Sequence, residues 1–67
     1  MVNVLPLITR LSQKEIMNVR VMHKDGTIHT VLCQLKDGAV DRYTFTVWDI
    51  ETKSYRKIPK ARVVGYY

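Results

Sequence analysis

The residues best suited to binding a ligand form a basic segment near the end of the chain. Residues 53–62 contain five basic side chains and no acidic one: Lys53, Arg56, Lys57, Lys60 and Arg62. The other 57 residues carry six basic and six acidic side chains, so the whole formal charge of +5 lies in this segment. Lys and Arg neutralise phosphates and release counterions, which favours a nucleic-acid partner. An acidic protein partner and a merely solvated face are the alternatives.

Aromatic residues accompany this basic segment. Tyr55 lies between Lys53 and Lys57 at strand spacing, which predicts a basic-aromatic-basic row on one face. Small barrels bind single strands by combining a charged groove with rings on which bases stack. Trp48 is expected to pack under an N-terminal helix, and the alternative is an exposed anchor of the kind found at binding hot spots.

Arg56 points away from this row and has two alternative roles. It shares a face with Ile58, which favours an ion pair with Asp49 across a hairpin over direct contact with a ligand. The candidate binding residues are therefore Trp48, Lys53, Tyr55, Arg56, Lys57, Lys60 and Arg62.

Metal binding and catalysis have little support in the sequence. His23 and His29 flank a predicted turn, and Cys33 would be a third zinc ligand, but this spacing matches no zinc finger. His29 and Cys33 would also lie about 13 Å apart along one strand. There is no Ser-His-Asp arrangement and no glycine-rich phosphate loop. We expect a protein that is not an enzyme and has no catalytic residue, metal or cofactor.

Length and composition limit the class of protein. A chain of 67 residues and 7.8 kDa predicts one domain whose core is too small for an enzyme with its own deep cleft. With 46% hydrophobic residues the chain is globular. The single cysteine excludes an internal disulfide framework and suggests a reducing compartment.

The apolar pattern predicts a cytoplasmic protein. The longest apolar stretch, residues 4–8, is short and contains Pro6, so no membrane span is expected. The N-terminus has neither the basic region nor the long apolar region of a signal peptide.

Hydrophobic spacing predicts the elements of the first half. Leu5, Ile8 and Leu11 favour a short helix within residues 1–12, beginning near Pro6. Residues 12–15 are interpreted as a turn, and a helix continuing through residue 17 is the alternative. Alternation then predicts a strand over residues 17–24, an Asp25-Gly26 hairpin turn and a return strand over residues 28–35.

The second half predicts three more strands. Residues 36–38 are expected to begin a loop, and residues 42–49 form a strand with Tyr43, Phe45 and Val47 in the core. Residues 54–58 form the fourth strand, residues 59–62 a 3-10 turn and residues 63–67 the fifth strand. The predicted fold is all-β: a small, closed five-stranded barrel with a short N-terminal helix. Residues 1–67 form a single domain, with a helix or arm over 1–12 and the barrel over 16–67. Closure is expected because an open sheet leaves two unprotected edges.

The order of these motifs resembles a known family. The motifs are Val19-x-Val21-x-x-Lys24-Asp25-Gly26-Thr27, Cys33-x-Leu35, Val47-Trp48-Asp49, Arg56-x-Ile58 and Arg62-Val63. Together they resemble the small Sm-like, SH3-like barrel proteins of the WYL type found in tailed bacteriophages, over residues 16–64. Tyr55 stands where the family pattern has a tryptophan. The resemblance implies a five-stranded barrel and a viral accessory role in a bacterial host cell, and larger WYL-domain proteins are regulators thought to sense nucleic acid or nucleotides.

Two functions from different classes follow. The first is a phage-type accessory or regulatory protein that binds single-stranded DNA or RNA through its basic edge. The alternative is a small viral protein that binds and modulates an acidic host protein of transcription or defence, with Trp48, Tyr55, Tyr66 and Tyr67 as anchors. Open strand edges also allow a homo-oligomer.

Overall fold

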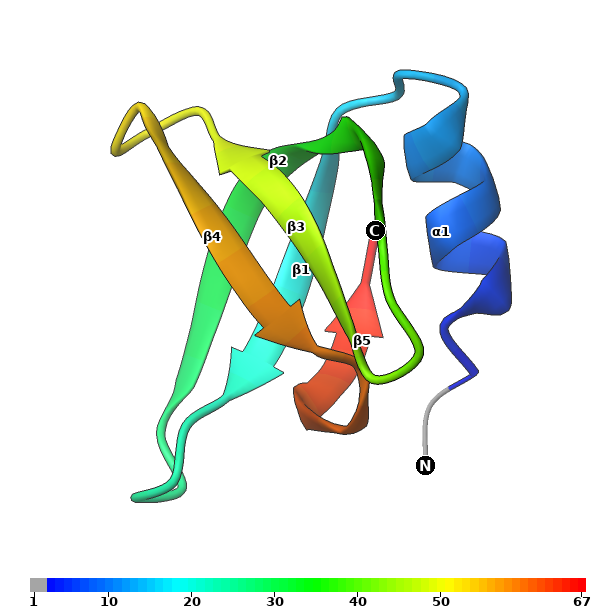
Figure 1. The fold of residues 1–67 in the computed structure, drawn as a ribbon. Helices are drawn as coiled ribbons and strands as arrows, with labels where there is room; N and C mark the ends of the chain where they lie inside the picture. The colour runs from blue at the N-terminus through cyan, green and yellow to red at the C-terminus, as the bar shows by residue number, and fades with distance from the viewer. Residues whose placement is uncertain (1–2) are drawn as a thin grey trace.

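One antiparallel sheet of five strands and one short helix account for the regular structure (Figure 1). The structure is a computed structural model that describes residues 3–67, apart from the side chains of residues 36–39. The elements are α1 (Leu5–Ser12), β1 (Met17–Met22), β2 (Ile28–Val40), β3 (Thr44–Asp49), β4 (Ser54–Pro59), the 3-10 turn η1 (Lys60–Arg62) and β5 (Val63–Tyr66). This confirms the mostly β fold, the N-terminal helix and the 3-10 turn before the last strand.

The sheet is open, so the predicted closure of a barrel is not observed. Its strand order is β4-β3-β2-β1-β5, which leaves β4 and β5 at the two edges. Within the described part of the chain, β4 pairs with β3 alone and β5 with β1 alone. The short turn η1 carries the chain from one edge strand to the other (Figure 1). The edges are thus connected through the backbone but not through hydrogen bonds between strands.

Helix α1 packs on one face of the sheet through Leu7 and Leu11, which are fully buried. The predicted stripe was wrong at Leu5, which is 69% exposed, because the buried residues follow i, i+4 spacing from Leu7. The helix ends at Ser12 and does not continue to residue 17, as the positive φ of 63° at Lys14 turns the chain away.

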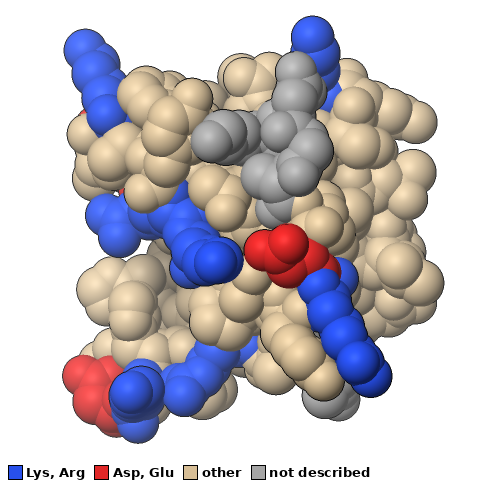
Figure 2. Space-filling view, in the orientation of Figure 1, with Lys and Arg blue, Asp and Glu red and all other residues tan. Residues whose placement is uncertain are grey.

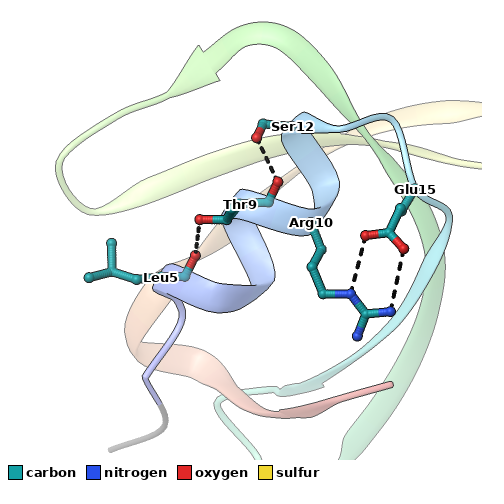
Figure 3. Close-up of polar contacts among 5 residues, drawn as sticks. All are labelled: Leu5, Thr9, Arg10, Ser12 and Glu15. Carbon is teal, nitrogen blue, oxygen red and sulfur yellow. Dashed lines mark hydrogen bonds and ion pairs between the residues drawn. The ribbon is translucent and has the colours of Figure 1, made fainter.

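Polar contacts stabilise the helix and the turn that follows it (Figure 3). The Thr9 hydroxyl donates to the Leu5 carbonyl, and the Ser12 hydroxyl donates to the Thr9 carbonyl. Arg10 Nε lies 3.2 Å from Glu15 Oε2. The interpretation of residues 12–15 as a turn is confirmed for the residues after Ser12, which is itself the last residue of the helix.

The first hairpin forms as predicted. In the turn between β1 and β2, Gly26 has a φ of +88°, a conformation that glycine adopts without steric cost. The Asp25 carboxylate accepts hydrogen bonds from the backbone N–H and the hydroxyl of Thr27. These contacts set the register that pairs Met17 with Cys33.

Two predictions around the second hairpin were wrong. Residues 36–38 do not begin a loop, because β2 continues to Val40. The polar break appears instead as a shift of register: Leu35 pairs with Val47 and Val40 pairs with Phe45, so four residues of β2 lie between these pairs, against one residue of β3. Tyr43 is not in the core but 70% exposed, because it precedes β3 in a turn closed by the hydrogen bond from Asp41 N–H to the Thr44 carbonyl.

The core lies on the helix-covered face of the curled sheet. Its buried residues are Leu7, Leu11, Met17, Val19, Cys33, Phe45, Val47, Ile58 and Val63. Every element except η1 contributes, so the helix and both edge strands are held to one apolar cluster. No helix in residues 3–67 is long and apolar enough to cross a membrane.

Candidate functional site

The pleat of β4 divides the predicted binding residues between two faces. Tyr55 and Lys57 pair with Trp48 and Thr46 of β3, whereas Arg56 pairs with the buried Val47. Because neighbouring strand residues point to opposite faces, Tyr55 lies on the outer face and Arg56 on the core side. The seven candidate residues therefore do not form one continuous surface.

On the outer face, the rings of Trp48 and Tyr55 meet edge to face. Their centroids lie 4.8 Å apart with an interplanar angle of 68°. Helix α1 packs on the opposite side, with Phe45 and Val47, so the expectation that it covers Trp48 was wrong. Trp48 is nonetheless only partly exposed, and Tyr55 remains exposed.

The predicted basic-aromatic-basic row was only partly correct. Tyr55 and Lys57 share the outer face of β4, but Lys53 precedes the strand in the β3–β4 turn. Lys53 has a φ of 54°, which breaks the alternation that the row requires. The row is therefore Tyr55 followed by Lys57, with Lys53 at the end of the hairpin.

On the core side, the predicted pair of Arg56 and Asp49 is confirmed. Arg56 Nε donates to Asp49 Oδ2 at 2.6 Å. The carboxylate is buried, with Asp49 only 5% exposed, and its Oδ1 accepts the backbone N–H groups of Glu51 and Thr52 at 3.0 and 3.2 Å. Burial by itself raises the pKa of Asp49, but the hydrogen bonds from Arg56, Thr52 and Glu51 outweigh it and hold the pKa below its ordinary value.

A groove of about 630 Å³ opens beside this ion pair. Its lining comes from the end of the β1–β2 hairpin, which includes Lys24, and from β4 and η1, which include Arg56 and Arg62. Its apolar lining includes Val21, Val31 and Ile58, which also pack in or against the core. Figure 2 shows Lys and Arg side chains over β4 and at the hairpin tip, on the same side of the molecule. The groove is thus apolar in its depth and mostly basic at its rim.

Two histidines line the hairpin wall of this groove. The rings of His23 and His29 lie 4.4 Å apart at an angle of 75°, so the two imidazoles share a face. Cys33 is not near enough to complete a zinc site, because it is buried in the core. Burial, reinforced by the negative charge of Asp49, raises the pKa of its thiol to about 12. The described residues contain no group of three or more His, Cys, Asp or Glu side chains that could hold a metal ion.

The remaining basic residues lie on the 3-10 turn between β4 and β5. Lys60 and Arg62 lie half-buried on η1, and only Arg62 lines the groove. Among the residues whose side chains are described, the ion pairs are Arg56–Asp49 and Arg10–Glu15. Four cations of the basic segment therefore have no acidic partner there: Lys53, Lys57, Lys60 and Arg62.

The hairpin wall is the part of the site that sequence reasoning missed. Lys24 lies 38 positions before Arg62, and nothing in the local pattern connects the two. The sequence suggested His23 and His29 only as possible metal ligands and did not indicate that they lie beside the basic segment.

Comparisons of this chain with protein-family models, with curated proteins and with solved structures give no match. The class of ligand therefore follows from the charged, aromatic and apolar residues of the groove and of the outer face of β4.

Proposed function

We propose that this protein binds single-stranded nucleic acid, without catalysis, along the edge formed by β4 and η1. The observation that carries the proposal is that this edge and the turn before it hold four cations without an acidic partner among the described side chains, together with the Trp48–Tyr55 ring pair on the outer face and the groove. Phosphates are bound by cations and bases by stacking, so both parts of a single strand have a complementary group here.

The number of phosphate contacts follows from the ion pairs. The carboxylate of Asp49 offsets the charge of Arg56, so a phosphate on Arg56 adds little to the salt dependence, which is set by Lys53, Lys57, Lys60 and Arg62. Four neutralised phosphates give a slope of log K against log salt of about −2.8 on single strands and about −3.6 on duplex. Tyr55 adds an exposed ring on which a base can stack.

The test is a fluorescence anisotropy titration with labelled oligothymidylate of about ten nucleotides at several salt concentrations. The double variant Lys53→Gln, Lys57→Gln should bind more weakly and reduce the slope by about 1.4. The control Lys14→Gln, Arg20→Gln removes the same charge from exposed positions outside β4 and η1 and should leave binding nearly unchanged. Equal losses in both double variants, or no binding by the unmodified protein at low salt, would overturn the proposal.

We also propose that the open sheet is an SH3-like barrel with incomplete closure. Four strands in hairpin succession, a 3-10 turn and a fifth strand that pairs with β1 support this. The relationship to WYL-type phage proteins, and with it a role in the cytoplasm of a bacterial host, rests on the sequence motifs. Recovery of a stoichiometric host protein from nuclease-treated bacterial lysate, without nucleic-acid binding, would favour the alternative of a host-protein modulator.

A further inference from the structure

We infer that Arg56 is the phosphate receptor of the groove and that Asp49 positions it. In this inference, which rests on the proposed function, the groove takes one nucleotide of a single strand. The phosphate lies on the guanidinium of Arg56, and the base and sugar lie against the apolar lining.

The ion pair with Asp49 leaves the two Nη groups of Arg56 available to a ligand. Of the Arg56 nitrogens, only Nε donates to Asp49, and neither Nη of Arg56 has a hydrogen-bond partner among the described residues. The side chain of Arg56 is 48% exposed and lines the groove. A guanidinium presents its N–H groups as a planar fork that matches two oxygens of one phosphate. Fixing Nε therefore directs the remaining donors at a ligand.

Asp49 is itself held in place, so it can fix Arg56. Its buried carboxylate accepts two backbone N–H groups of the β3–β4 turn through Oδ1 and uses Oδ2 for Arg56. An arginine with this support loses less side-chain entropy on binding than a solvated lysine. The pair thus combines the two roles that the sequence left as alternatives, since Arg56 is both paired and available to a ligand.

The groove provides the other contacts that one nucleotide needs. Its volume of about 630 Å³ lies within the range of about 300–1,000 Å³ typical of small-molecule sites. Val21, Val31 and Ile58 offer apolar contact for a base, and Arg62 and Lys24 line the same groove and can contact the neighbouring phosphates. Because β4 is an edge strand, a single strand that crosses it reaches both Tyr55 on the outer face and Arg56 in the groove.

Two substitutions separate a positioned receptor from simple charge attraction. Arg56→Lys keeps the charge but loses the fork, and it should weaken oligothymidylate binding about tenfold with an unchanged salt slope. Asp49→Asn removes an acid, so charge attraction alone predicts tighter binding. A positioned receptor predicts weaker binding, because the strong charged partner of Nε is lost. Circular dichroism confirms that each variant is folded, and Asp49→Glu replaces Asp49→Asn if the latter is not.

A measurement on the unmodified protein supports the variants. The NMR signals of the Arg56 guanidinium should shift on addition of oligothymidylate and, in the same direction, of thymidine monophosphate, while thymidine without phosphate should leave them in place. Unchanged affinity in Arg56→Lys, or tighter binding in Asp49→Asn, would overturn this inference while the protein still binds. Absence of any binding by the unmodified protein would instead overturn the proposed function.

Discussion

Trp48 and Tyr55 are direct cross-strand neighbours on the outer face, with their rings edge to face at 4.8 Å. Aromatic pairs of this geometry stabilise a fold beyond the area that they bury. The pair therefore strengthens the edge strand β4 and also presents the exposed ring of Tyr55 beside the basic residues.

Replacing Tyr55 by Ala should lower the free energy of unfolding by about 0.5–1.5 kcal/mol, because the ring contact with Trp48 is lost. Urea denaturation followed by tryptophan fluorescence measures this change, and the native emission of Trp48 should also shift. Tyr43→Ala is the matched control, since this tyrosine lies outside the strands. Equal losses in the two variants would contradict a specific role for the pair.

The contribution of Asp49 to the free energy of unfolding should be lost in acidic solution. Its pKa in the folded protein is lower than the ordinary value of 3.8, so its stabilising effect is complete above that value and is lost as the pH falls through the folded pKa. The difference in unfolding free energy between the protein and Asp49→Asn should therefore be constant above about pH 5 and shrink in more acidic solution. A difference that grows below that pH would show that the carboxylate is not held ionised.

The contact of α1 with the sheet should be among the larger contributions to stability. Leu7→Ala removes a fully buried side chain from the core and should cost about 2–5 kcal/mol, enough to unfold much of a domain this small. Leu5→Ala, in the same helix, should change the unfolding free energy by no more than about 0.5 kcal/mol. Thermal denaturation monitored by circular dichroism compares them, and similar midpoints would show that the helix does not cover the core.

Cys33 should be chemically inert in the folded protein. Its thiol is buried and its pKa is raised to about 12, so little thiolate forms at neutral pH. Ellman's reagent should therefore react slowly with the native chain and rapidly after unfolding in urea. Because the sequence has a single cysteine, the unfolded chain is its own control. Rapid labelling of the native protein would place Cys33 at the surface.

Local patterns predicted the elements well where short-range chemistry decides. Alternation from Met17 and the Asp25-Gly26 turn gave the first hairpin, because both the two-residue period and the positive φ of glycine are properties of neighbouring residues. The pairing of Arg56 with Asp49 was also predictable, since the two residues lie on facing strands of one tight hairpin.

Predictions failed where the wider structure overrides the pattern. Tyr43 is apolar and in phase with Phe45, but the turn before β3 moves it to the surface. The polar residues 36–38 predict a loop, but β2 stays paired with β3 on both sides of them through a shift of register. Leu5 fits a helical stripe, but the side of α1 that packs on the sheet carries Leu7 instead.

The sequence by itself determined the mostly β architecture and the confinement of the net charge to residues 53–62, since both depend on residue order alone. Only the tertiary structure decided which of those charges act together. The pleat of β4 sends Tyr55 and Arg56 to opposite faces, and the fold brings Lys24 and Arg62 into the lining of one groove. Long-range strand order and packing place these groups, and a local pattern contains no information on either.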